Sequence, residues 1–384
     1  MTPLPLEGVR VIDFTQVMLG PSCTQVLGDY GAEVIKIEKE KIGDLSRWSL
    51  GSDPDGDRNP VFSSLNRNKK SVALNLKEQQ ARDHVLKLID TADVVVNNFR
   101  PGVMERMGMG YEDLRARNRR IIYAVGTGFG LEGPNRHKGG QDILAQALSG
   151  VMERKPDPDL PMAIYSTPLC DYSAGMHLVQ GILLALLQRE KTGEGQRVAV
   201  SLYNSMLAMQ MQEAAAHLMR GTELNWGAFP LTGCFETTTR PFVMVGAFKE
   251  NPLRDICTAL GIEDLSQEER FRDFDAQMAH RAELQEIFRR AFAQNSREHW
   301  LERLEAVDIL CAPVRTLAEA LEDEQTKVNR MVVDAGETPA GLVRLVASPI
   351  DMSGARFSIR QAPPRLGEHN EEIIGPLRVR EGAA

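Results

Sequence analysis

An aspartate that directly precedes a long amphipathic pattern is the residue of this sequence best placed for covalent chemistry. Asp171 lies in the segment 169–177, LCDYSAGMH, and from Met176 onward apolar residues recur three and four positions apart. That spacing predicts a helix with one buried face, preceded by the end of a strand. Asp171 is then either an N-cap, whose oxygen accepts first-turn amides, or a nucleophile. The two roles are compatible, because a helix start lowers the pKa of a carboxylate and keeps it anionic.

The elements around Asp171 predict an α/β fold. Short β-rich runs at 9–14, 33–38, 71–76, 93–99, 121–125 and 196–202 alternate with helical patterns at 22–30, 77–91, 111–117 and 142–153. Such alternation is typical of a parallel sheet that helices cover on both faces. Ligands of open sheets bind in the loops after the carboxyl ends of the strands.

The second half of the chain predicts a smaller α+β domain. A helix is expected over 203–220, followed by an extended stretch at 234–245 and helices at 252–260, 281–293 and 297–305. Methionines in the first of these helices could line an acyl pocket, or could serve a core or subunit contact. The extended, proline-punctuated segment 342–366 is expected to return to the first domain. The predicted divisions are 1–222 for a large domain with the ligand site and the candidate nucleophile, 223–325 for a small domain, and 326–384 for the C-terminal return.

Composition narrows the class of protein. The chain has 384 residues, of which 42% are apolar and 26% charged, with a net charge of -8. The length predicts two domains, and the acidic balance argues against nucleic acid as the main partner. The N-terminus lacks a signal-peptide pattern, and the longest apolar run, 182–187, is far too short for a bilayer. We therefore expect a cytoplasmic protein without a membrane partner. Five scattered cysteines without a C-x-x-C pair predict reduced thiols, with Cys170 a packing residue.

The sequence lacks the motifs of several common enzyme classes. The loop after the first expected strand reads TQVMLGP, so no G-x-G-x-x-G cradles a dinucleotide. A phosphate-binding G-x-x-x-x-G-K-[ST] loop and a G-x-S-x-G nucleophile elbow are likewise missing from the sequence. The seven histidines show no metal-ligand spacing, and His177 is interpreted as a helix-surface residue rather than a base. No metal site and no tightly bound cofactor are predicted.

Cations follow several of the expected strands. Lys39, Arg106, the NFRPG segment at 98–102 and the run Arg67-Asn68-Lys69-Lys70 could gather around a nucleotide phosphate. Taken singly, each cation is more typical of solvated surface charge than of a ligand site. Their recurrence at strand ends favours a ligand site.

The sequence resembles the class III CoA-transferases, the family that includes formyl-CoA transferase, carnitine CoA-transferase and α-methylacyl-CoA racemase. Similar segments occur in order along nearly the whole chain: GVRVIDFTQVMLGPSCTQVLGDYGAEVIKIEK, NRNKKSVALNL, ADVVVNNFRPGVMERMG, CDYSAGMH, KTGEGQRVAVSL, DILCAPVRTLAEAL and PPRLGEHNEEI.

The resemblance implies a mechanism and a set of substrate contacts. It places the catalytic aspartate at Asp171, which would form a mixed anhydride with the donor acyl group and then an aspartyl-CoA thioester. Coenzyme A and acyl-CoA are substrates, and the partner substrate is a free carboxylate. The family's CoA-contacting positions correspond to Met18, Leu19, Lys39, Leu74, Asn75, Leu76, Lys77, Asn98, Phe99, Arg100, Arg106, Gly139, Gly140, Gln141 and Asp142.

The resemblance also implies an architecture and two alternatives. The architecture is a Rossmann-like large domain with a small α+β domain in an interlocked, ring-shaped homodimer. Formyl-CoA transferase has Gln where Met18 stands, and a glycine-rich loop where this chain reads VMVGAFK over 243–249, so oxalate is not the expected acceptor. The racemases carry His where Gln141 stands, and an amide cannot shuttle a proton near neutral pH. Racemase or epimerase chemistry, or a catalytically idle CoA-binding protein, are the alternatives to CoA transfer.

Overall fold

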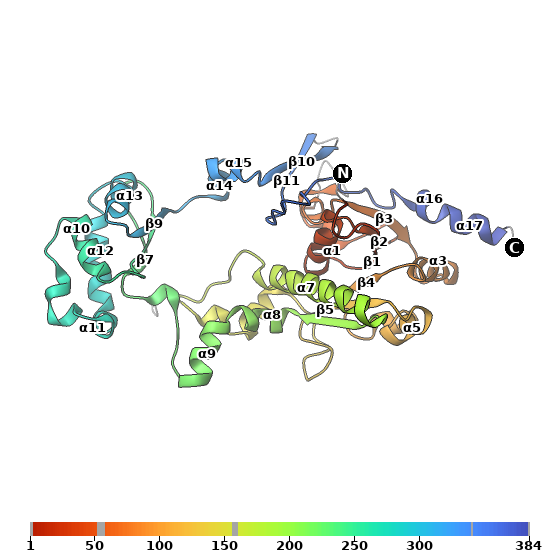
Figure 1. The fold of residues 1–384 in the computed structure, drawn as a ribbon, viewed down its shortest axis with the longest axis horizontal. Helices are drawn as coiled ribbons and strands as arrows, with labels where there is room; N and C mark the ends of the chain where they lie inside the picture. The colour runs from red at the N-terminus through yellow and green to blue at the C-terminus, as the bar shows by residue number, and fades with distance from the viewer. Residues whose placement is uncertain (1–2, 52–57, 156–159, 339–340, 383–384) are drawn as a thin grey trace. The chain divides into compact units, whose positions relative to one another are not determined.

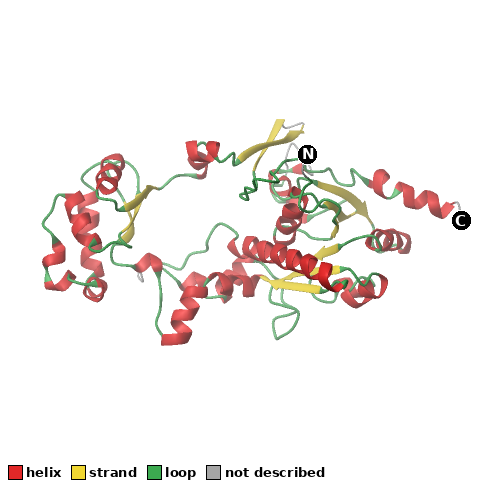
Figure 2. Cartoon of the chain, in the orientation of Figure 1, coloured by secondary structure: helices red, strands yellow, loops and turns green. Residues whose placement is uncertain are grey.

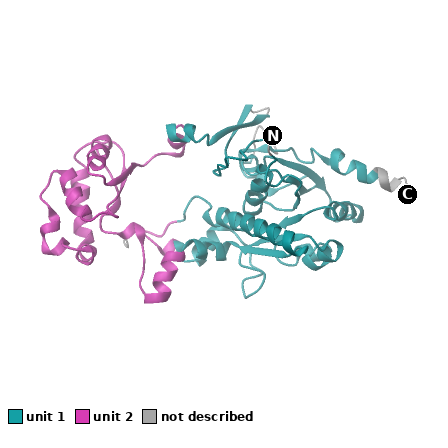
Figure 3. Ribbon diagram, viewed as in Figure 1, with its two compact units in different colours: residues 1–151, 164–210, 324–384 teal, residues 152–163, 211–323 magenta. Residues whose placement is uncertain are grey.

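The chain folds into two compact units. The computed structural model describes residues 3–51, 58–155, 160–338 and 341–382. Unit 1 comprises residues 1–151, 164–210 and 324–384, and unit 2 comprises 152–163 and 211–323 (Figure 3). The units divide at 210/211 rather than at the expected 222/223. The physical reason is a helix break at Gln210: α8 (Leu202–Met209) buries Leu202 and Met206, whereas α9 (Met211–Arg220) buries no residue.

Unit 1 is built on a six-stranded parallel sheet with the order β3-β2-β1-β4-β5-β6 (Figures 1 and 2). Its strands are β1 (Arg10–Asp13), β2 (Glu33–Lys39), β3 (Lys69–Leu74), β4 (Val94–Asn97), β5 (Ile122–Thr127) and β6 (Arg197–Ser201). All six lie where the sequence predicts them, to within a few residues. The order reverses between β1 and β4, which is the point where doubly wound sheets bind ligands.

Helices connect these strands and cover the sheet. They are α1 (Leu19–Asp29), α2 (Pro60–Ser63), α3 (Gln79–Ile89), α4 (Val103–Arg106), α5 (Tyr111–Arg117), α6 (Asp142–Leu148), α7 (Leu169–Thr192) and α8, with the 3-10 helix η1 (Leu45–Trp48). A further 3-10 helix, η3 (Val151–Glu153), begins at the last residue before the 151/152 division. Helices α1 and α7 pack against each other, and α7 also packs on β5 and β6. Helices α3, α4 and α5 contribute to a hydrophobic core with Ile12, Ile35 and Val95 of the strands.

The strands of unit 1 send two kinds of side chain to their two faces. In β2, Ile35 and Ile37 enter the hydrophobic core, while the alternate residues Lys36 and Glu38 are buried among polar groups. Asp13 of β1 is buried on the same side as Lys36, because successive strand residues point to opposite faces. The α1 side of the sheet therefore carries buried charge, unlike the opposite, apolar side.

Helix α7 is the longest helix and is apolar enough to cross a membrane by length and composition alone. The core helix of a globular protein passes the same test, and α7 buries Ala174, Leu178 and Ile182 inside unit 1. Its close approach to α1 depends on Gly175. A Cβ at that position would lie 2.1 Å from Ser22 Oγ and 2.7 Å from Leu19 O, which no side chain could tolerate without movement of a helix.

Unit 2 holds a three-stranded antiparallel sheet of β7 (Thr232–Phe235), β8 (Phe242–Val245) and β9 (Leu310–Pro313). The helices of this unit are α9, α10 (Pro252–Leu260), α11 (Phe274–Ala279), α12 (Arg281–Phe292), α13 (Arg297–Ala306) and α14 (Leu317–Leu321), with the 3-10 helices η4 (Trp226–Ala228), η5 (Leu265–Gln267) and η6 (Glu269–Phe271). Phe235, Phe242, Phe288 and Phe292 form the centre of its core. This is the α+β organisation that the sequence predicts.

The C-terminal segment belongs to unit 1. It contains α15 (Glu324–Val328), the hairpin of β10 (Val332–Thr338) and β11 (Gly341–Val346), α16 (Asn370–Ile373) and α17 (Gly375–Gly382). The Ala73 N–H of β3 donates to Asn370 Oδ1 at 2.8 Å, and the His369 N–H donates to Ser71 O at 3.0 Å. The division between unit 2 and this segment falls at 323/324, close to the expected 325/326.

Candidate functional site

A cavity of about 730 Å³ opens in unit 1 at the carboxyl ends of β1, β4 and β5. Its volume is in the range of sites for small molecules and cofactors. It lies where the strand order reverses, as expected for a doubly wound sheet. Its walls come from the loops after these strands and from the starts of α1, α6, α7 and α8, and they comprise Gln16, Val17, Met18, Leu19, Leu45, Asn98, Phe99, Arg100, Pro101, Gly126, Thr127, Gly128, Arg136, Lys138, Gly139, Gly140, Gln141, Asp142, Ile143, Leu144, Asp171 and Leu202.

The cavity brings together ten of the residues that the sequence nominates. Besides Asp171 they are Met18, Leu19, Asn98, Phe99, Arg100, Gly139, Gly140, Gln141 and Asp142. Six others lie outside its walls. Leu74 and Leu76 pack with the hydrophobic core, Asn75 donates to Glu78, and Lys39, Lys77 and Arg106 are exposed at the surface. A role in binding CoA stays a prediction for all of the nominated residues, inside the cavity wall and outside it.

The basic run Arg67–Lys70 is not a phosphate site. Arg67 forms a buried ion pair with Asp29 at 2.8 Å, and Lys69 lies buried 3.3 Å from Asp13. Lys70 contacts Glu33 and Glu372. These cations pair with carboxylates of the fold itself, because the run enters β3, where Arg67 and Lys69 are buried and Lys70 is half-buried.

Asp171 stands inside helix α7, as its third residue, rather than at the N-cap. The N-cap is Pro168, which offers no side-chain acceptor, and the described residues before it, 160–168, form no strand. The capping acceptor comes instead from α6. Asp142 Oδ2 accepts the backbone N–H of Cys170 at 2.7 Å and that of Asp171 at 2.9 Å. Asp142 therefore fixes the first turn of the helix that carries Asp171.

The charge state of Asp171 also differs from the sequence prediction. Burial and the neighbouring Asp142 carboxylate raise the pKa of Asp171 to about 6, although the Leu19 backbone N–H bonds to it and lowers the pKa in part. Burial outweighs the helix start here, because the ionised form loses more solvation than a single amide restores. Burial likewise raises the pKa of Cys170 to about 12, together with Asp142 and Asp171, which makes its thiol unreactive at neutral pH.

Three contacts hold the loops that form the cavity walls. Asn98, after β4, accepts the Gln16 N–H at 2.9 Å and donates to the Gln16 carbonyl at 2.7 Å, so it ties the loop after β4 to the loop after β1. Gly128 and Gly140 face each other so closely that a Cβ on Gly128 would lie 2.5 Å from Gly140 Cα. The loop after β4 is thus tied to the loop after β1, and the long loop between β5 and α6 folds back on itself at Gly128 and Gly140.

Three cations line the cavity: Arg100, Arg136 and Lys138. The sequence nominated only Arg100. Arg136 and Lys138 lie in the loop after β5, where ligands of open sheets are expected to bind. The sequence analysis did not nominate them, because they are several residues beyond the end of the strand. Leu45 had no such signal, because it enters through η1, which follows β2 at a distance. Cations beside an apolar wall suit a ligand with phosphate groups and an apolar arm.

Metal chemistry finds no support among the residues that the structure describes. They contain no group of three or more His, Cys, Asp or Glu side chains that could hold a metal ion. His177 lies outside the cavity wall, and its Nδ1 is 3.0 Å from Ser205 Oγ. The ionisable side chains of the cavity wall are two carboxylates and three cations.

Comparison with known proteins identifies the family. Residues 6–370 match the family described as CoA-transferase family III. The chain belongs to CoA-transferase family III. It is 33% identical to the succinyl-CoA:glutarate CoA-transferase of Mus musculus over 99% of this chain and 88% of the relative. It is also 33% identical to the formyl-CoA:oxalate CoA-transferase of Streptomyces coelicolor, over 98% and 96% of the two chains.

Solved structures support the same assignment. The crystal structure of Rv3272 from Mycobacterium tuberculosis superposes with a TM-score of 0.87 at 31% identity, over 97% of this chain and all (100%) of that one. A CAIB/BAIF family protein from Brucella suis gives a TM-score of 0.86 at 30% identity, over 98% and 100% of the two chains. The family predicted from the sequence is confirmed. The protein is a class III CoA-transferase that acts on CoA thioesters and carboxylates.

Proposed function

We propose that this CoA-transferase works through covalent intermediates on Asp171. Among the residues that the structure describes, two carboxylates line the cavity. Asp142 gives one oxygen to the start of α7 and the other to Gln146 Nε2 at 2.5 Å, so it is committed to structure. Asp171 accepts only a backbone N–H, from Leu19, among the contacts that shift its pKa. The placement of this carboxylate in the cavity wall is the observation that carries the proposal.

The proposed reaction has four steps. An Asp171 oxygen attacks the carbonyl carbon of the donor thioester, and the C–S bond breaks to release CoA thiolate and leave an acyl-aspartyl anhydride. The thiolate then attacks the aspartyl carbonyl, which expels the donor acid and forms an aspartyl-CoA thioester. The acceptor carboxylate opens that thioester to a second anhydride and releases the thiolate. Attack of the thiolate on the acceptor carbonyl forms the new acyl-CoA and regenerates Asp171. Each step exchanges bonds of similar energy, which is the advantage of covalent catalysis.

The cavity supplies what these steps need. A carboxylate with a pKa of about 6 is largely ionised at neutral pH, yet it is a stronger nucleophile than an ordinary aspartate. The Leu19 N–H, at the start of α1, points to the same carboxyl group and can stabilise negative charge on it. Arg100, Arg136 and Lys138 would hold the phosphates of CoA.

The acyl donor and the acceptor are expected to be organic acids of the kinds that the relatives use, whose names include succinyl-CoA with glutarate and formyl-CoA with oxalate. Racemase chemistry is the less favoured alternative, because Gln141 rather than a histidine lies next to Asp142 in the wall.

A homodimer is part of the proposal. On α7, Leu184 is 66% exposed and Leu187 is 65% exposed, and on α9 Leu218 and Met219 are exposed. Apolar side chains grouped on helices in this way are typical of surfaces that a subunit contact covers. Light scattering should give the mass of a dimer. A location in the cytoplasm with reduced thiols completes the proposal.

The test uses an acceptor carboxylate labelled with heavy oxygen. The protein is incubated with a panel of acyl-CoAs and labelled carboxylic acids, and products are measured by mass. In the proposed sequence the second anhydride breaks so that one acceptor oxygen stays on Asp171, so the peptide that contains Asp171 gains heavy oxygen with turnover. Asp171→Asn should abolish exchange and labelling while it retains CoA binding. Asp113→Asn, which alters a capping carboxylate at α5 outside the cavity, is the matched control. Exchange at the wild-type rate in Asp171→Asn would sink the proposal.

A further inference from the structure

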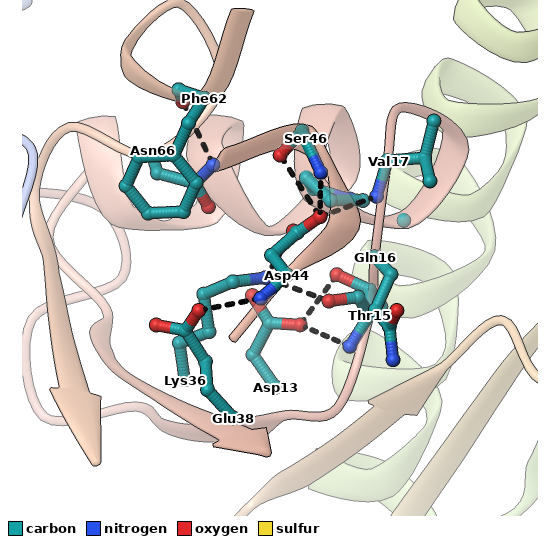
Figure 4. Close-up of polar contacts among 12 residues, drawn as sticks. Asp13, Thr15, Gln16, Val17, Lys36, Glu38, Asp44, Ser46, Phe62 and Asn66 are labelled. Atoms are coloured by element: carbon teal, nitrogen blue, oxygen red, sulfur yellow. Dashed lines mark hydrogen bonds and ion pairs between the residues drawn. The ribbon is translucent and has the colours of Figure 1, made fainter. Parts of the chain in front are cut away.

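Beneath the cavity, on the α1 side of the sheet, unit 1 buries six charged side chains next to one another. This buried charge cluster consists of three carboxylates and three cations, Asp13, Glu38, Asp44, Lys36, Arg47 and Lys69. Lys36 Nζ lies 2.9 Å from Asp44 Oδ2, and both side chains are 0% exposed. Arg47 donates to both carboxylate oxygens of Glu38. Glu38 Oε2 also accepts the Asp44 N–H at 2.8 Å (Figure 4).

Asp44 and Lys36 of the cluster stay ionised at neutral pH. Burial raises the pKa of Asp44, but Lys36 and the amides of Val17 and Ser46 outweigh it and lower the value to about 2. Asp44 and Asp13, with Glu38, in turn raise the pKa of Lys36 against the effect of burial. With three charges of each sign, the cluster is neutral as a whole. Buried ion pairs of this kind are seldom more stabilising than apolar residues of similar volume, so stability alone does not account for them.

The cluster holds the loop that follows β1. Lys36 Nζ donates to the Thr15 carbonyl at 2.6 Å, and Asp13 Oδ1 accepts the Thr15 N–H at 2.8 Å. Asp44 Oδ1 accepts the Val17 N–H at 3.0 Å (Figure 4). Val17 has a φ of 67°, a left-handed conformation that is strained for a β-branched residue. Hydrogen bonds to buried charges keep the loop in this otherwise unfavourable path.

The loop leads directly to the reacting group. Gln16, Val17, Met18 and Leu19 line the same cavity as Asp171. The backbone N–H of Leu19 lowers the pKa of Asp171. We propose that Asp44 and Lys36 are positioning residues for the transfer reaction, which act by holding Thr15 and Val17 so that the Leu19 N–H meets the Asp171 carboxylate. Neither side chain lines the cavity. This inference rests on the proposed role of Asp171.

Asp44→Asn tests the proposal. Asparagine keeps the size of the side chain but leaves Lys36 beside a neutral amide. The Val17 amide should then exchange with solvent about tenfold faster or more. Formation of the covalent adduct on Asp171 should slow by about 10- to 100-fold, as expected for a small displacement of a reacting group. The dissociation constant for CoA should change by less than about threefold, because other loops make most of the cavity wall.

Asp29→Asn is the matched control. Asp29 is a buried partner of Arg67 in the same unit, yet it touches neither the loop after β1 nor the cavity. This variant should leave both Val17 exchange and adduct formation within about twofold of wild type, since distant sites act independently. An equal loss in both variants would overturn the proposal, because it would reflect general destabilisation.

A second variant covers the case in which Asp44→Asn fails to fold. Lys36→Met combined with Asp44→Leu removes both partners of the ion pair, so neither is left unpaired, and the remaining charges keep their partners in the pairs Arg47–Glu38 and Lys69–Asp13. Such an exchange is often neutral for stability. It should fold, expose the Val17 amide and slow adduct formation to a similar degree. Wild-type exchange and adduct rates in this variant would overturn the proposal. A wild-type protein that forms no adduct with a proven substrate would overturn the role of Asp171 alone, and Val17 exchange would still decide whether the cluster holds the loop.

Discussion

Replacement of the proposed nucleophile should make the protein more stable. The pKa of Asp171 is raised from 3.8 to about 6 in the folded chain, chiefly by burial, so ionisation of this carboxyl opposes folding. The cost is absent below the unfolded pKa, grows as the pH rises and is complete above the folded pKa. From these two pKa values, Asp171→Asn should raise the free energy of unfolding of unit 1 by about 3 kcal/mol at pH 7, but by only about 1 kcal/mol at pH 4.5.

Native-state hydrogen exchange measures this effect within unit 1. The slowest amides of β5 and α7 give the free energy of opening for wild type and variant at both pH values. Asp44→Asn should change the stability in the opposite direction and destabilise unit 1. The pKa of Asp44 is lowered to about 2, so its ionised form stabilises the fold above pH 3.8. An Asp171→Asn protein that is no more stable than wild type at pH 7, or a gain that does not shrink as the pH falls, would refute the reasoning.

Three further predictions concern activity. Because the pKa of Asp171 is about 6, kcat/KM for acyl-CoA should fall about tenfold per pH unit below pH 6. Asp142→Asn should shift this decline to lower pH, because it removes a charge that raises the pKa of Asp171. A decline at the same pH in the variant would exclude Asp142 as a cause of the raised pKa. Gly175→Ala should slow adduct formation by about 100-fold, because its Cβ would strike Ser22 and the Leu19 carbonyl, whereas exposed Gln180→Ala should not; equal rates in stopped-flow assays would contradict this. Arg100→Ala should weaken CoA binding about tenfold by calorimetry, less so in high salt, and a salt-independent affinity would argue against a phosphate contact.

The sequence predicted the architecture well because local patterns encode it directly. All six strands of unit 1 were located from runs such as EVIKIE, in which the period of two and the β-branched residues act together. Helix α5 and helix α10 were predicted to the residue, since each has a clear start signal before a periodic run. The helix expected over 203–220 was wrong in one respect: it breaks at Gln210, where the sequence holds neither glycine nor proline.

The site was predicted in outline and missed in detail. Strand-end loops and the family resemblance nominated ten residues that do meet in the cavity, including Asp171. The assignment of Arg67–Lys70 to phosphate binding failed, because their partners Asp29, Asp13 and Glu372 are distant in sequence. The sequence also could not predict that Asp142 caps α7. Asp142 and the start of α7 are far apart along the chain, and only the packing of α6 against α7 brings them together.

The sequence by itself determined the order of the elements, the family and the identity of the candidate nucleophile, because these depend on local periodicity and on motifs within short segments. Tertiary structure alone decided the state of that nucleophile. The pKa of Asp171 depends on the burial of its carboxyl group, on the charge of Asp142 and on the amide of Leu19, three surroundings supplied by different parts of the fold. Where the sequence predicted an N-cap with a lowered pKa, folding instead gives a partly desolvated carboxyl group with a raised one, because solvation is a property of the packed molecule and not of the helix start.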